Sequence, residues 1–341
     1  MAPDATRCPA IFGVEGLTLR ADERAFFEVE KPLGFILFAR NIDNPDQVKA
    51  LVRDLKSTVG EAPSLVLIDQ EGGRVARLRQ PHWPEYPKGA DFGERYGQDP
   101  QAALKAIKTN ARLIADDLAA LGINVDCLPI LDVRAPDGHD VIGDRAYGSD
   151  PEAVAALGRA VCEGLLEGGV LPVIKHMPGH GRAMSDSHHE LPVVDAPLEE
   201  LEKTDFAPFQ ALADMPLGMT GHLLFTQLDR EESATTSSFV IKNVMRGFIG
   251  FDGLLMSDDL NMEALEGTLG ERAARAQAAG CDVALHCNGN LEEMRQVAEA
   301  LSPITDKAMA RFNAALALLK PPEAFDRKAA VAERNRLLAV A

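Results

Sequence analysis

Short apolar runs rich in Val, Ile and Leu recur along the chain and alternate with longer segments of helical periodicity. Eight runs predict buried strands, at residues 11–14, 34–38, 64–69, 124–128, 171–175, 217–221, 253–257 and 282–287. Helices are predicted between them, among others at 46–58, 100–121, 151–167 and 270–279. Continuous apolar strands separated by helices indicate a parallel sheet, because such strands are buried on both faces.

The alternation begins near the N-terminus, and no Gly/Ser/Pro-rich linker interrupts it. A single (β/α)₈ TIM-like barrel spanning residues 1–341 is therefore the predicted fold, with two helices in 302–341 packed on its exterior. Two ordinary domains are an alternative for 341 residues. So is a doubly wound open sheet, but the GxGxxG loop that normally follows its first strand is absent.

The amino-acid composition and net charge limit the kinds of molecule that the protein is expected to bind. Hydrophobic residues make up 46% of the chain and charged residues 26%, as in globular proteins that bury a sizeable core. A net charge of −17 repels phosphate backbones and anionic lipids, and no basic patch offsets it, so neither nucleic acid nor a membrane is an expected partner.

The cysteines and the N-terminus bear on the compartment. Five scattered cysteines without CxxC spacing argue against a disulfide framework or a thiolate zinc site. No secretory signal and no run of 18 apolar residues is found. We therefore expect a cytoplasmic protein, and we expect it to be a monomer.

Polar residues stand at the ends of several of the predicted strands or directly after them. They are Asp69, Lys175 with His176, His222, and Asp258 with Asp259. The active site of a barrel enzyme is built at the C-terminal ends of its strands, so these side chains are predicted to point into the barrel mouth.

The densest polar segment, residues 174–192, holds four histidines and an aspartate. His176 and His180 have the spacing of zinc-binding helices, but Pro178 and Gly179 interrupt any helix and HExxH is absent, so no metal is expected. Asp186 could hold one imidazole nitrogen of His188, which would then donate and accept protons near neutral pH. A polar loop with incidental histidines is the alternative.

Two further segments carry acids. Asp258 and Asp259 repel each other unless they are used or hydrogen-bonded, so a functional role is favoured over a helix N-cap. Strand alternation points them to opposite sides, so only one is predicted to face a ligand. The segment 68–77 combines Asp69 with Arg74 and Arg77. Carboxylate and guanidinium groups can hydrogen-bond to the hydroxyls of sugars.

Together these segments resemble glycoside hydrolase family 3, in particular its short bacterial β-N-acetylglucosaminidases. The resemblance extends over about residues 10–290. It rests on GFILFARN (34–41), IDQEGGRV (68–75), VIGDRAYG (141–148), KHMPGHG followed by DSH (175–188) and MSDDLNM (256–262). Met177 stands where phenylalanine is more usual.

The resemblance implies a barrel without the second domain of longer members, a retaining two-step mechanism and no cofactor. It implies Asp258 as nucleophile and His188 as acid/base with Asp186 as its partner. The residues it implies for holding the N-acetylglucosamine ring are Asp69, Arg77, Arg145, Lys175 and His176. The expected substrates are peptidoglycan fragments, that is, muropeptides of the GlcNAc-anhydroMurNAc type, cleaved during cell-wall recycling.

Other functions stay open from the sequence. In substrate-assisted catalysis the sugar's acetamido oxygen would attack while Asp258 and Asp259 orient it, although the histidine loop argues against this. A β-glucosidase, a xylosidase or an N-acetylglucosaminide phosphorylase would share the retaining chemistry. A non-catalytic sugar-binding barrel is the alternative from a different class.

Overall fold

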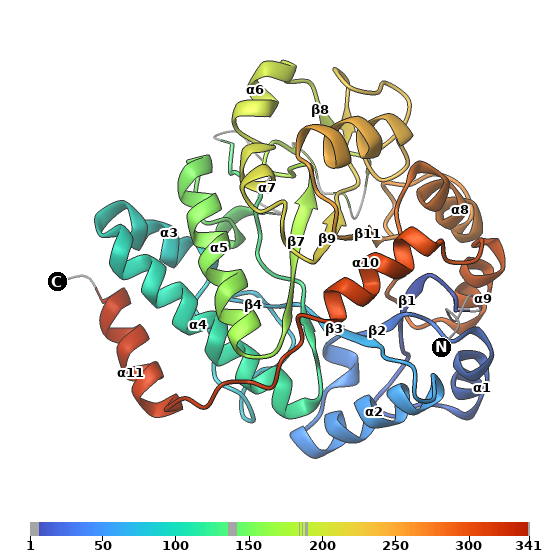
Figure 1. The fold of residues 1–341 in the computed structure, drawn as a ribbon, viewed down its shortest axis with the longest axis horizontal. Helices are drawn as coiled ribbons and strands as arrows, with labels where there is room; N and C mark the ends of the chain where they lie inside the picture. The colour runs from blue at the N-terminus through green and yellow to red at the C-terminus, as the bar shows by residue number, and fades with distance from the viewer. Residues whose placement is uncertain (1–6, 136–141, 184, 186, 188–189, 340–341) are drawn as a thin grey trace.

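Eight parallel strands close into a barrel in the computed structural model, which describes residues 7–135, 142–183, 185, 187 and 190–339. Helices surround the barrel (Figure 1). In spatial order around the barrel the strands are β1 (Ala10–Gly13), β2 (Gly34–Leu37), β3 (Leu65–Ile68), β6 (Val125–Asp126), β7 (Leu171–Met177), β9 (Leu217–Thr220), β11 (Leu254–Asp259) and β12 (Val283–His286). Each of the eight predicted strands is found, and the predicted (β/α)₈ barrel is confirmed.

Two strands run further than predicted. β7 continues to Met177 and β11 continues to Asp259, so His176, Asp258 and Asp259, which lie beyond the predicted strands, belong to the strands themselves. Each strand also loses its regular register near this end, between Ile174 and Met177 in β7 and between Met256 and Asp259 in β11. Regular side-chain alternation therefore does not extend to the ends that carry the polar groups.

Helices are found in every segment predicted to be helical, and further helices occur elsewhere along the chain. The helices are α1 (Ala21–Glu30), α2 (Pro45–Thr58), α3 (Gly89–Gln98), α4 (Pro100–Leu121), α5 (Pro151–Glu167), α6 (Leu198–Lys203), α7 (Ala207–Ala211), the π-helix η3 (Val240–Phe248), α8 (Leu269–Ala279), α9 (Leu291–Ala300), α10 (Asp306–Leu316) and α11 (Arg327–Leu338). Short 3₁₀ turns occur at η1 (Ala39–Asn41) and η2 (Gly143–Arg145). Two small sheets, β4 (Gln70–Gly72) with β5 (Val75–Ala76) and β8 (Val193–Val194) with β10 (Leu224–Phe225), lie outside the barrel.

Three of the helices start with the same kind of residue pair, a capping residue followed by proline. α2, α4 and α5 each begin with proline directly after a capping residue, which is Asn44, Asp99 and Asp150 respectively. Each capping side chain accepts a hydrogen bond from a backbone N–H of the first turn, and proline there loses no helical hydrogen bond. These starts could therefore be predicted to within a residue.

The barrel interior forms a hydrophobic core of its own, which α10 closes at one end. Ala308 and Phe312 of α10 pack with residues at the starts of the strands, including Leu65, Leu171 and Leu217. Figure 1 shows α10 crossing in front of the strands. The opposite end, where the strands finish, is left for a ligand.

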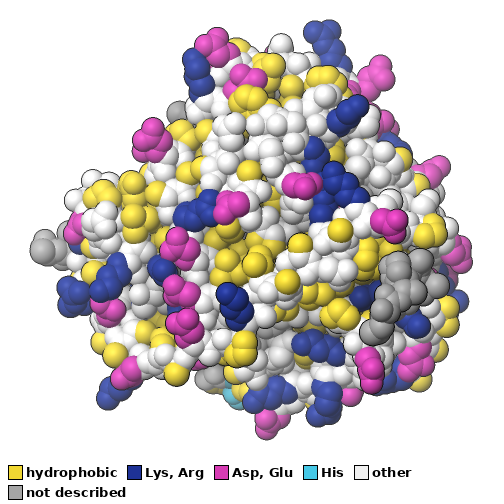
Figure 2. Space-filling model, viewed as in Figure 1, with side chains coloured by type: hydrophobic (Ala, Val, Ile, Leu, Met, Phe, Trp, Pro, Cys, Tyr) yellow, Lys and Arg dark blue, Asp and Glu magenta, His cyan; other side chains and the backbone are white. Residues whose placement is uncertain are grey.

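The outer surface carries charges of both signs. On the face shown in Figure 2, Lys and Arg side chains are interspersed with Asp and Glu side chains. All five cysteines are buried and free. Within the described part of the chain, no helix combines the length and the apolar character needed to cross a membrane.

Candidate active site

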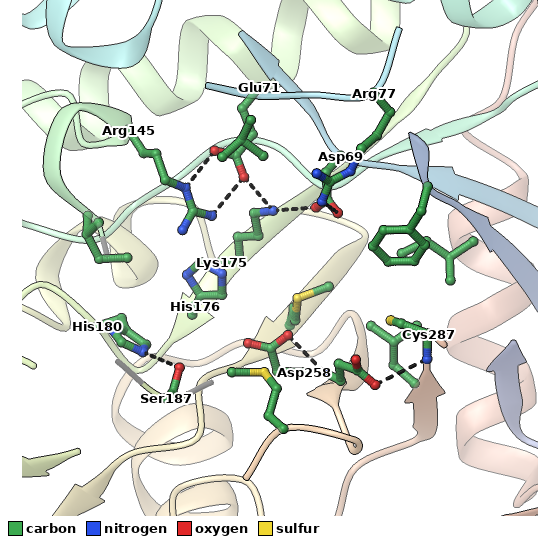
Figure 3. Close-up of a pocket in the computed structure, with 18 of the residues that line it drawn as sticks. Asp69, Glu71, Arg77, Arg145, Lys175, His176, His180, Ser187, Asp258 and Cys287 are labelled. Carbon is green, nitrogen blue, oxygen red and sulfur yellow. Dashed lines mark hydrogen bonds and ion pairs between the residues drawn. The ribbon is translucent and has the colours of Figure 1, made fainter. Parts of the chain in front are cut away.

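A pocket of about 500 Å³ opens at the C-terminal ends of the strands. It collects six of the predicted site residues, which come from separate segments of the chain (Figure 3). These are Asp69, Arg77, Arg145, Lys175, His176 and Asp258. Apolar side chains complete the walls, among them Ile36, Phe38, Met219, Met262 and Leu285.

The other two predicted site residues, Asp186 and His188, lie outside the described residues. Ser187, between them in sequence, lines the pocket, and its Oγ lies 3.2 Å from His180 Nε2. The proposed pairing of Asp186 with His188 therefore stays a prediction.

Lys175 is at the centre of an ion-pair network on the pocket wall. Its ammonium lies 2.9 Å from Asp69 Oδ1 and 2.8 Å from Glu71 Oε1. Arg77 donates to the other oxygen of Asp69 at 3.0 Å, and Arg145 donates to both oxygens of Glu71 at 2.8 Å. Two carboxylates thus alternate with three cations (Figure 3).

The network keeps its carboxylates ionised despite deep burial. Burial alone would raise the pKa of Glu71, but Arg145 and Lys175 beside it lower it to about 2. Burial likewise opposes the charge of Asp69, and again the neighbouring cations Lys175 and Arg77 lower the pKa below its usual range. The pocket therefore presents fixed acceptors and fixed cationic donors, an arrangement suited to sugar hydroxyls.

Glu71 was missed in the sequence, although it lies two residues after Asp69. Residues two apart in an extended segment share a side, and this was the signal that could have identified it. Arg74, from the same segment, lies at the pocket rim, where its Nε lies 3.1 Å from Asp144 Oδ1.

A second missed acid, Asp132, holds the start of the histidine segment. It is fully buried, and its Oδ2 lies 2.7 Å from His176 Nδ1. Its Oδ1 accepts the backbone N–H groups of His176 and His180, at 3.1 and 2.7 Å. Burial alone would raise the pKa of Asp132, but His176 lowers it to about 2.

Asp258, one residue before the end of strand β11, is an ionised carboxylate. Burial favours its neutral form, but His176 and the backbone N–H of Asp259 hold its pKa below the ordinary value. One of its oxygens accepts the backbone N–H of Asp259 at 2.8 Å. The pocket therefore contains a carboxylate available as a nucleophile or as an electrostatic stabiliser.

The prediction that only one acid of this pair faces the pocket is wrong, because both Asp258 and Asp259 line it. The irregular register of β11 between Met256 and Asp259 explains why simple alternation fails. The two acids nevertheless differ. Asp259 accepts the backbone N–H groups of Asn261 and Cys287 at 3.1 Å, and burial together with Asp258 raises its pKa to about 6.

His222, also expected in the barrel mouth, lies beneath it. The residue is fully buried, with Nδ1 2.7 Å from Thr235 Oγ1 and Nε2 3.0 Å from the carbonyl oxygen of Asp259. A carbonyl can only accept, so Nε2 donates to it. Burial lowers the pKa of His222, so the ring is a neutral support for the end of β11.

Among the described residues, no group of three or more His, Cys, Asp or Glu side chains is arranged to hold a metal ion. His176 and His180 have ring centroids 5.7 Å apart, and Asp132 accepts hydrogen bonds from both residues. Their four-residue spacing therefore serves a hydrogen-bonded turn around Asp132.

Comparison with known proteins agrees with this site. The model of the glycosyl hydrolase family 3 N-terminal domain matches residues 16–319. The chain therefore belongs to glycosyl hydrolase family 3, and it is a glycoside hydrolase.

The similar proteins include beta-hexosaminidases and the solved structure of NagZ. A beta-hexosaminidase of Chromobacterium violaceum is 39% identical over 304 residues, 87% of this chain and 83% of the relative. A beta-hexosaminidase of Bordetella avium is 37% identical over 286 residues, which are 82% of this chain and 80% of the relative. NagZ from Neisseria gonorrhoeae, in native form and in complex with N-trifluoroacetyl-D-glucosamine, superposes with a TM-score of 0.87 at 31% identity, covering 98% of this chain and 99% of NagZ.

Proposed function

We propose that the protein is a retaining β-N-acetylglucosaminidase that releases terminal β-linked N-acetylglucosamine from peptidoglycan fragments during cell-wall recycling. The observation that carries the proposal is the ionised Asp258 in a pocket walled by the Asp69–Lys175–Glu71–Arg145 network. The beta-hexosaminidase relatives support the sugar, and so does the N-acetylglucosamine analogue bound to the gonococcal protein.

The proposed mechanism uses Asp258 as the nucleophile and His188 as the acid/base. Asp258 attacks the anomeric carbon while His188 protonates the departing oxygen, which leaves the sugar bonded to the carboxylate. His188, now without that proton, takes a proton from water, and the water oxygen displaces Asp258 from the anomeric carbon. Two inversions give net retention. Asp186 holds His188 in the tautomer that both steps need.

The use of an imidazole as acid/base bears on the leaving group. Most retaining glycosidases use a second carboxyl group for this role. An imidazole without its proton is neutral, whereas a carboxylate is anionic, so the imidazole repels an anionic muropeptide fragment less. This supports muropeptides as substrates. The proposal also includes a monomeric enzyme in the cytoplasm that acts without a cofactor.

The test is an assay of the wild type, Asp258→Ala and His188→Ala on chromogenic N-acetyl-β-glucosaminides and glucosides, with and without phosphate. We expect hydrolysis of the N-acetylglucosaminide alone, no phosphate dependence, and an inactive Asp258→Ala. His188→Ala should lose far less on a substrate with an activated leaving group, which needs no proton. A wild type inert toward N-acetylglucosaminides would refute the substrate, and a fully active Asp258→Ala would refute the nucleophile.

A further inference from the structure

The carboxylate of Asp132 contacts the His176 ring at one of its two nitrogens, Nδ1. Its Oδ1 accepts two backbone N–H groups, and its Oδ2 faces His176 Nδ1 at 2.7 Å. The pKa of Asp132 stays near 2 because His176 offsets the effect of burial, so the group is ionised at neutral pH. An ionised carboxylate can only accept hydrogen bonds, so the proton in this contact lies on Nδ1.

The second ring nitrogen of His176 faces the sugar pocket. No described residue hydrogen-bonds to Nε2, and this atom is absent from the fully buried polar atoms that lack a partner. The residue lines the pocket, and Figure 3 shows its ring between Lys175 and Asp258. Because Nδ1 is held by Asp132, Nε2 is the nitrogen available to a bound sugar.

We propose that Asp132 is a positioning residue, which locks the His176 ring with its proton on Nδ1 and presents Nε2 to a hydroxyl of the bound sugar beside Asp258. The proposal rests on the function proposed above. It adds a residue that touches neither the sugar nor the reacting atoms and acts only through His176. Such an outer carboxylate sets both the orientation and the hydrogen-bonding character of the ring.

Asp132→Asn separates this role from simple packing. The two backbone N–H groups on Oδ1 are fixed donors, so the amide oxygen must take that position. The amide NH₂ then faces His176 Nδ1 and donates to it, which moves the ring proton to Nε2. The variant keeps the shape of the side chain and its hydrogen bonds to the backbone. In the His176 ring, the nitrogen that donates and the nitrogen that accepts are exchanged.

The direct readout is the ¹⁵N NMR spectrum of the histidine side chains. The chain has eight histidines, and His176→Gln identifies the signals of His176. We expect a protonated Nδ1 in the wild type and an unprotonated Nδ1 in Asp132→Asn. In parallel, kcat/KM on a chromogenic N-acetyl-β-glucosaminide should fall by about 10- to 100-fold, the range known for losing a carboxylate that orients a metal-bound histidine.

Asp282→Asn is the matched control, because Asp282 is a buried carboxylate at the opposite end of the barrel. It accepts from Arg246, Arg311 and the backbone N–H of Leu255, and it does not line the pocket. The control should lower the unfolding temperature and leave kcat/KM and the His176 signals unchanged.

A wild-type spectrum without a proton on Nδ1 overturns the proposal, and so does an Asp132→Asn variant with wild-type kcat/KM. The wild-type spectrum decides even if the variant does not fold. It also needs no substrate. A wild type inert toward the sugar therefore refutes the proposed function, while the spectrum still reports on the Asp132–His176 lock.

Discussion

Replacing Glu71 by glutamine removes the charge on which Lys175 and Arg145 converge. Two hydrogen bonds from Arg145 and an ion pair with Lys175, each at 2.8 Å, end on this carboxylate, whose side chain is only 4% exposed. The glutamine keeps the shape but turns an NH₂ group toward a cationic donor. Removing one partner from a buried ionic group is strongly destabilising, because the remaining charges lose their compensation.

The magnitude follows from the pKa of Glu71, which the cations lower from 4.5 to about 2 against the effect of burial. A folded-state pKa below the unfolded value stabilises the fold at every pH above the unfolded value. Here that contribution is about 3 kcal/mol. It is lost as the pH falls from 4.5 toward 2, because the folded protein then binds the proton that the unfolded chain already carries.

The assay is urea unfolding of the wild type and Glu71→Gln at several pH values between 3 and 7. We expect the variant to be less stable by about 3 kcal/mol at pH 7 and by less than about half of that at pH 3. Glu199→Gln is the control, since Glu199 is 80% exposed and pairs with Lys203 on the surface. Its effect should stay below about 1 kcal/mol. A Glu71→Gln difference that is equal at both pH values, or larger in acid, would refute the reasoning.

Two further predictions concern Asp259 and the packing of α3. Burial raises the pKa of Asp259 from 3.8 to about 6, so ionised Asp259 lowers the stability increasingly as the pH rises from 3.8 toward 6, and the loss levels off above 6. Asp259→Asn should therefore raise the free energy of unfolding by about 3 kcal/mol at pH 8 and by less than about 1 kcal/mol at pH 4. An equal gain at both pH values would contradict this. Gly93→Ala would place its Cβ 1.6 Å from the carbonyl oxygen of Tyr147, whereas a Cβ at Gly97 of the same helix meets nothing within 4 Å. Thermal unfolding should show a clear loss of stability for Gly93→Ala and a gain in stability of up to about 1 kcal/mol for Gly97→Ala. Similar effects of the two changes on stability would rule out the close contact at Gly93.

The sequence was sufficient for the fold because two strong local signals coincide. Apolar strands buried on both faces read as continuous runs, and helices such as α4 and α5 start at an acid–proline pair that caps them. The strand ends were less predictable. β11 is irregular where Asp258 and Asp259 lie, and its register depends on neighbouring strands that a local pattern does not contain.

Some site residues could be predicted from the sequence and others could not, for a related physical reason. Asp69, Lys175 and Asp258 were found because each follows an apolar run at the barrel mouth. Arg145 came only from the family resemblance. Asp132 went unnoticed because its importance depends on His176, which lies 44 residues further along the chain. Such long-range partners carry no periodic signal.

The most direct test of the central claim is to incubate the enzyme with a fluorinated N-acetylglucosamine analogue that carries an activated leaving group, and to measure the mass of the intact protein and of its peptides. The account predicts a mass increase of one sugar, located on Asp258 by peptide fragmentation and absent in Asp258→Ala. An adduct on another residue, or turnover of the natural sugar through an acetamido-derived intermediate with no adduct at all, would contradict it.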